Sequence, residues 1–64
     1  MAVRNYPKGC RKAVKRISGM LCVSAEAAWQ MMLTTAALMD LRPGDPEVTR
    51  MILLDCGIED AEIA

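Results

Sequence analysis

Histidine and phenylalanine are absent from this 64-residue chain, which has only three cysteines, one tryptophan and one tyrosine. The absence of histidine excludes the mixed Cys/His zinc sites, and three cysteines cannot close a thiolate site by themselves. The odd cysteine count, with no Cys-x-x-Cys pair, argues against a disulfide framework. We therefore predict reduced thiols in a cytoplasmic protein that binds no metal and no cofactor.

The residue combinations that catalysis usually requires are also missing. The sequence has no histidine base, no glycine-rich phosphate loop and no nucleophile next to a base, and its carboxylates are scattered. We predict that the chain is not an enzyme. A membrane-spanning helix needs about 20 apolar residues, and the longest apolar stretch, residues 25–41, is interrupted by Glu26, Gln30 and Asp40. We expect no membrane partner.

Acidic residues are absent from the first 25 positions, although the formal net charge of the chain is zero. The six basic residues of this segment are Arg4, Lys8, Arg11, Lys12, Lys15 and Arg16. The remaining residues carry all eight acids and only two bases, Arg42 and Arg50. Such an asymmetry indicates an acidic partner, such as nucleic acid, a membrane surface or another protein. Alternatively, the basic residues form a solvated helix face or pair with the acidic part of the same chain.

The composition favours an all-α fold in one small domain. Ala, Met and Leu are abundant, and runs of β-branched or aromatic residues are absent. Apolar periodicity predicts three helices, at about residues 8–21, 25–41 and 46–56. Ser24 and Asp45 are the expected N-caps of the last two helices, and Gly57 is expected to end the third. The predicted domain spans 1–64, with loosely ordered termini at 1–6 and 59–64.

The predicted second helix is apolar nearly all round, with a narrow polar strip of Glu26, Gln30 and Thr34. A helix of this kind must be buried on nearly all sides. We do not expect two other short helices to cover it, so we predict a homodimer, or a partner protein, on its uncovered side. Aromatic residues and methionines suit such interfaces. The candidate interface residues are Trp29, Met31, Met32, Leu33, Ala36 and Met39.

The segment from Ile17 to Ser24 reads Ile-Ser-Gly-Met-Leu-Cys-Val-Ser and resembles the turn of a helix-turn-helix DNA-binding unit. That family reads Ile-Ala-x-x-Leu-Gly-Val-Ser, and Cys22 here replaces a glycine that favours positive φ. The resemblance covers about residues 11–35. It implies that the helix from Ala25 enters the major groove, with Gln30 as the natural base reader. This helix contains no Arg or Lys, so phosphate contacts would come from the preceding basic helix.

The chain also resembles, to a lesser extent, the ribbon-helix-helix fold, whose members are obligate dimers with a short N-terminal strand and a Ser-capped second helix. Residues 1–7 would supply that strand, with Arg4 reaching bases. The burial demand of the second helix suits such a dimer, whereas the third helix is an addition to that fold.

Two functions from different classes follow from these patterns. We predict a small nucleic-acid-binding transcriptional regulator that uses its basic N-terminal helix on the phosphate backbone. The candidate contact residues are Arg4, Lys8, Arg11, Lys12, Lys15, Arg16 and Gln30. The alternative is a small protein-interaction module, an adaptor or inhibitor of the kind that phages and mobile elements encode. It would dock on a partner protein through its apolar second helix.

Overall fold

The computed structural model describes residues 6–7 and 9–63, and this part of the chain forms four α-helices and no strand. The helices are α1 (Arg11–Leu21), α2 (Ala25–Met39), α3 (Pro46–Asp55) and α4 (Asp60–Ile63). The predicted all-α fold is confirmed for these residues. Three of the helices match the predicted ones, and α4 is an addition.

The predicted helix ends are confirmed where a side chain caps the backbone. The Ser24 hydroxyl accepts a hydrogen bond from the Ala27 N–H at 3.1 Å, and an Asp45 carboxylate oxygen accepts from the Glu47 N–H at 2.9 Å. Each of these bonds satisfies one of the N–H groups that a helix start leaves without a partner. Gly57 follows α3 with a φ of +90°, as is typical of the residue after a helix.

The first two helices are shorter than predicted. Gly9 has a φ of +92°, and the Cys10 N–H bonds to the Pro7 carbonyl in a turn, so α1 begins only at Arg11. At the other end of α2, Asp40 takes the left-handed conformation, and the Leu41 N–H reaches back to the Ala36 carbonyl at 2.9 Å. This is a Schellman-type ending, which closes the helix at Met39.

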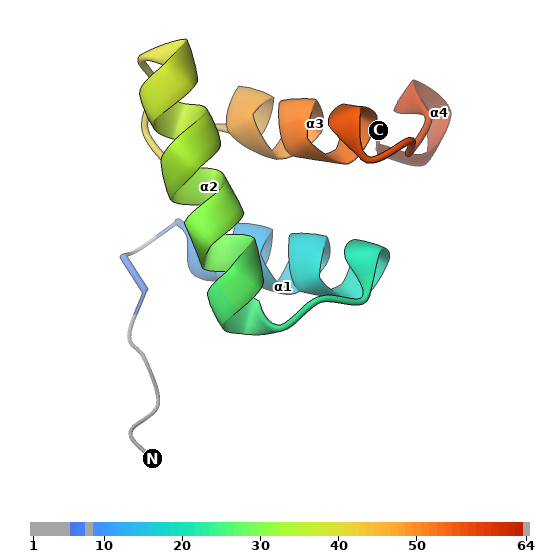
Figure 1. Ribbon diagram of the computed structural model, residues 1–64, viewed down its shortest axis with the longest axis horizontal. Helices are drawn as coiled ribbons and strands as arrows, with labels where there is room; N and C mark the ends of the chain where they lie inside the picture. Colours follow the sequence, from blue (N-terminus) through green and yellow to red (C-terminus); the bar gives the residue numbers. More distant parts are fainter. Residues whose placement is uncertain (1–5, 8, 64) are drawn as a thin grey trace.

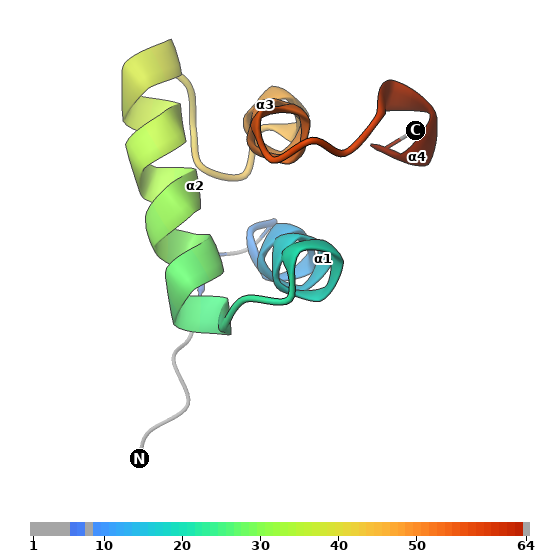
Figure 2. The same ribbon diagram turned by 45° about the vertical axis from the view of Figure 1, so that its right-hand side comes forward.

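Two helices lie side by side and the third crosses both. Figure 1 shows α1 and α3 running in the same general direction, with α2 lying across them, and Figure 2 shows the same pair nearly end-on beside α2. Each of these three helices packs on the other two, whereas α4 packs on α3. Because α2 crosses both neighbours, one of its faces is covered along most of its length.

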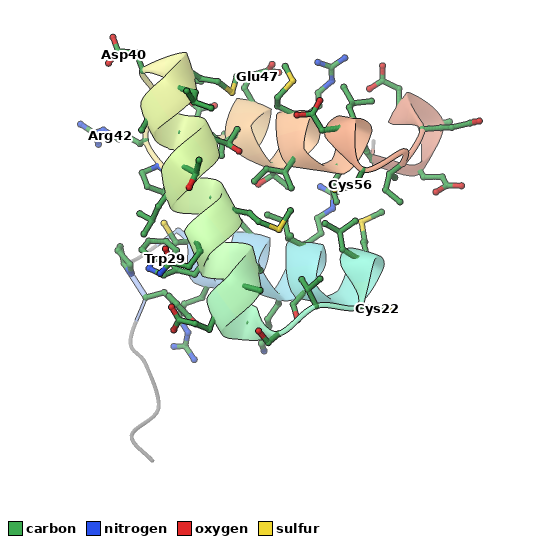
Figure 3. All side chains as sticks on the ribbon, in the orientation of Figure 1. Cys22, Trp29, Asp40, Arg42, Glu47 and Cys56 are labelled. Atoms are coloured by element: carbon green, nitrogen blue, oxygen red, sulfur yellow. The ribbon has the colours of Figure 1, made fainter. Side chains whose placement is uncertain are left out.

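The core fills the space between α2 and the α1–α3 pair. Its largest fully buried side chains are Val14, Ile17, Met32, Val48 and Leu53. Burying a side chain of this size stabilises the fold by about 1.5–3 kcal/mol relative to exposure. At the edge of the core, Trp29 projects toward the segment before α1 (Figure 3), and its ring centroid lies 5.2 Å from that of Tyr6.

The C-terminal segment folds back onto the domain. Residues 59–64 were expected to be loosely ordered, yet α4 forms one helical turn and Ile63 is only 8% exposed. The carbonyl of Ile63 accepts a hydrogen bond from the Arg16 guanidinium of α1. Burial of one apolar side chain, together with this hydrogen bond, gives the acidic tail a fixed place.

Candidate functional site

The outward face of α1 carries four basic side chains, all exposed: Arg11, Lys12, Lys15 and Arg16. The opposite face carries Val14 and Ile17, which are buried. Residues four apart on a helix are neighbours, so the cations form two rows along the axis, one of Arg11 and Lys15 and one of Lys12 and Arg16. We call these four residues the basic face.

Among residues 6–7 and 9–63, no carboxylate forms an ion pair with the basic face. The ion pairs found there both belong to Arg50 of α3, which lies 3.1 Å from Asp60 and 3.7 Å from Glu47. The hydrogen bonds that Arg50 donates to Asp60, followed by the charges of Asp60 and Glu47, raise the pKa of Arg50. Asp60 and Glu47 are thus paired with Arg50, and no ion pair joins the basic face to a carboxylate of the described residues.

The turn between α1 and α2 is held by two hydrogen bonds between Ser18 and Val23. The Ser18 hydroxyl donates to the Val23 carbonyl at 2.6 Å, and the Val23 N–H donates to the Ser18 carbonyl at 3.2 Å. Cys22 sits between them with a φ of +56°. Positive φ costs a residue with a Cβ about 1–2 kcal/mol, so glycine would fit this position with less strain. After this turn of three residues, α2 crosses α1 steeply (Figure 1).

The solvent-exposed side of α2 carries three polar residues but no basic one. Glu26, Gln30 and Thr34 are exposed there, and the Gln30 amide nitrogen donates to a Glu26 carboxylate oxygen at 3.1 Å. Gln30, the predicted base reader, therefore already has a partner on its own helix. Neither Arg nor Lys occurs between Ala25 and Met39.

The same side of α2 and the residues just after it also carry exposed apolar side chains. Leu38 is 83% exposed, and Leu33 and Leu41 are each 38% exposed. We call these three residues the leucine edge. The sequence alone suggested an uncovered side of α2, but of these leucines only Leu33 was among the predicted interface residues.

The other predicted interface residues of α2 contribute to the domain's own packing. Trp29, Met32 and Ala36 are buried in the core, and Met31 and Met39 are half-buried against it. The physical reason is the crossing arrangement, in which α1 and α3 together cover the side of α2 that carries these residues. Within the single chain, therefore, only Leu33 of the predicted set is substantially available to a partner.

Two predicted nucleic-acid contacts, Arg4 and Lys8, lie outside the residues that the structure describes. Arg16 has an additional role that the sequence did not suggest, since its guanidinium holds the Ile63 carbonyl. The row of Lys12 and Arg16 borders a cleft between α1 and the start of α3. This cleft is lined by Gly9, Lys12, Ala13, Arg16, Gly44, Pro46 and Thr49.

Within residues 6–7 and 9–63, the acidic and cysteine side chains nowhere gather in a group of three or more that could hold a metal ion. No helix in this part of the chain has both the length and the apolar character needed to cross a membrane. Comparison with known proteins finds no significant match to a family model, a curated protein or a solved structure.

Proposed function

We propose that this chain is a small nucleic-acid-binding regulator whose basic face contacts the phosphate backbone. One observation carries the proposal: four cations are exposed along one side of α1, and within the described part of the chain no carboxylate pairs with them. Neutralising phosphates with such side chains releases condensed counterions, which is the main source of non-specific affinity for nucleic acids.

The spacing of these cations suits an extended row of negative charges. Residues four apart on a helix lie about 6 Å apart along the axis, because each residue rises 1.5 Å. Adjacent phosphates of one DNA strand are separated by a similar distance, so the pair Arg11 and Lys15 can contact neighbouring phosphates. Hydrogen bonds to phosphate position a protein on the duplex without reading its sequence.

In this proposal α2 makes a smaller contribution than it does in a typical helix-turn-helix protein. Its exposed polar side chains, Glu26 and Gln30, are hydrogen-bonded to each other, and the helix contains no Arg or Lys. The resemblance to a helix-turn-helix unit therefore gives little support for base recognition by α2. We expect modest discrimination between nucleic-acid sequences.

The test is fluorescence anisotropy of a labelled 20-base-pair duplex, titrated with the protein at several salt concentrations. Each phosphate contact contributes about 0.9 to the slope of log K against log salt. The double variant Arg11→Ala, Lys15→Ala should therefore bind at least about tenfold more weakly and show a slope smaller by about two. Alanine is a good helix former, so both positions should remain helical.

The matched control is Arg42→Ala, which removes an exposed cation from the connection between α2 and α3. This variant should retain the affinity and the salt slope of the unaltered chain within a factor of about two. The control removes one charge and the double variant removes two, so a slope change in the control of about half that in the double variant would show that net charge alone, and not the basic face, determines binding.

The leucine edge favours a second candidate function, a protein-interaction module or homodimer that uses the outer side of α2. Leu38 is 83% exposed, and clustered exposed apolar side chains are typical of interaction sites. Sedimentation velocity over a range of concentrations tests self-association. A homodimer through α2 predicts that Leu38→Gln shifts the chain to the monomer, whereas Glu59→Gln, at an exposed position between α3 and α4, leaves the dimer intact.

A further inference from the structure

The cleft between α1 and the start of α3 has an unusual lining for a surface depression. Its cationic residues are Lys12 and Arg16, and no acidic residue lines it. The other lining residues are small or carry no charge: Gly9, Ala13, Gly44, Pro46 and Thr49. Two like charges with no carboxylate between them leave this cleft with a positive potential.

Thr49 adds a polar group to this cleft. It is only 6% exposed, and it is the buried polar residue of the described core. Its hydroxyl makes no hydrogen bond to any described residue. Every fully enclosed polar side-chain atom of the described residues has a partner, so the Thr49 oxygen must still be reached from the cleft. An accessible hydroxyl that has no partner among the described residues is able to donate a hydrogen bond to a group bound in the cleft.

The start of α1 strengthens the positive potential. Cys10 makes no side-chain capping hydrogen bond, and the first turn of α1 contains no acidic residue. The partial positive charge at the start of the helix is therefore not offset by a carboxylate, in contrast to α3, where Asp45 caps and Glu47 follows. Lys12 lies in this first turn, next to the cleft.

Arg16 is held in place by the C-terminal turn. Its guanidinium donates to the Ile63 carbonyl, and Ile63 itself is buried. A guanidinium has five N–H donors, so Arg16, which also lines the cleft, keeps donors beyond the one that bonds to Ile63. Fixing the side chain beforehand lowers the entropy lost when an anion binds.

We propose that this cleft binds one phosphate group, with Lys12 and Arg16 supplying the charge and the Thr49 hydroxyl donating a hydrogen bond. A phosphate has several oxygens directed to different sides, so it can accept from all three donors at once. The inference deepens the proposed function, on which it rests for the source of the ligand: a backbone phosphate of nucleic acid. Free inorganic phosphate presents the same chemistry and is the other source to be distinguished.

The test compares Thr49→Val with Thr35→Val in the full chain. Valine keeps the shape of threonine and removes only the hydroxyl, and Thr35 is a half-buried threonine of α2 outside the cleft. Binding of the labelled duplex should weaken about tenfold in Thr49→Val, the loss expected for a hydrogen bond to a charged group. The salt slope should not change, since threonine carries no charge, whereas Lys12→Ala should lower it by about one. Thr35→Val should bind as the unaltered chain does.

Nitrogen-15 NMR spectra of the unaltered chain, titrated separately with a 12-base-pair duplex and with inorganic phosphate at constant ionic strength, locate the ligand. Shifts at the Lys12, Arg16 and Thr49 amides with the duplex support the proposal. A duplex that binds without shifting Thr49, and that binds Thr49→Val with full affinity, overturns the cleft while leaving the proposed function in place. If inorganic phosphate shifts these amides and the duplex does not bind at all, the cleft stands as a site for free phosphate and the proposed function fails. If neither ligand shifts them, the cleft is overturned, and the proposed function fails with it only if the anisotropy titration shows no duplex binding.

Discussion

Helices α1 and α2 resemble each other on the side that faces the core and differ on the side that faces solvent. Inside, α1 buries Val14 and Ile17 and α2 buries Met32 and Ala36. On the side that faces solvent, α1 presents four cations. On the corresponding side, α2 presents polar residues without cations and, together with Leu41 just after it, the leucine edge. The two outer surfaces therefore suit different partners: a polyanion for α1 and an apolar surface for α2.

The comparison also separates stability from function. Exposed charges contribute little to the free energy of unfolding, about 0–1 kcal/mol for each exposed pair. A contribution to stability therefore does not explain why four cations lie on the basic face. The leucine edge likewise leaves apolar area in water, which does not stabilise the single chain. Substitutions on the two outer surfaces should change binding, and substitutions on the two inner surfaces should change stability.

The largest expected effect is on the inner surfaces. Ile17→Ala and Met32→Ala each remove a side chain that is fully buried, and each should lower the free energy of unfolding by about 2–5 kcal/mol. The urea midpoint, followed by far-ultraviolet circular dichroism, measures this loss. Leu38→Ala is the outer-surface control and should change the midpoint little. A large loss in Leu38→Ala would show that its side chain is covered in solution, in favour of a dimer.

A smaller effect is expected where α1 joins α2. Ser24→Ala removes the hydroxyl that accepts from the Ala27 N–H and should lower the free energy of unfolding by about 1 kcal/mol. Thermal unfolding by circular dichroism measures it. Ser24→Asp keeps an acceptor at the cap and should retain most of the stability, whereas an equal loss in both variants would mean that the cap does not hold this junction.

The smallest effect concerns backbone strain in the same turn. Cys22 has a φ of +56°, where glycine is not strained, so Cys22→Gly should raise the free energy of unfolding by about 0.5–1 kcal/mol, since the flexibility of glycine in the unfolded chain offsets part of the gain. Asp40→Gly at the end of α2, where φ is +57°, should gain less, because Asp tolerates this conformation better than most residues. Chemical unfolding compares the two, and a loss in Cys22→Gly would contradict the expectation.

Local signals in the sequence predicted much of the fold. Ser24 and Asp45 mark the starts of α2 and α3 because capping depends only on nearby backbone, and Gly57 marks the end of α3 for the same reason. The apolar periodicity that predicted α1 rests on residues such as Val14 and Ile17, which helical spacing places on one face, and this face is buried. The cations Arg11, Lys12, Lys15 and Arg16 are exposed on the rest of the helix.

Tertiary packing determined what could not be predicted. Trp29, Met32 and Ala36 were assigned to an interface because a helix that is apolar all round gives no sign of which side its own chain covers. The docking of Ile63 depends on space left beside α1 and α3, and a four-residue turn carries too little periodicity to reveal it. Thr49 also showed no signal, since only the folded chain places it near Lys12 and Arg16.

The salt dependence of duplex binding by the unaltered chain tests the central claim most directly. Anisotropy titrations between about 50 and 200 mM salt should give affinities that fall steeply, with a log–log slope of about −3 to −4, as expected if the four cations of the basic face contact phosphates. A slope near zero, or no binding at the lowest salt, would contradict a phosphate-contacting role for α1. The leucine edge would then be the surface on which to look for function.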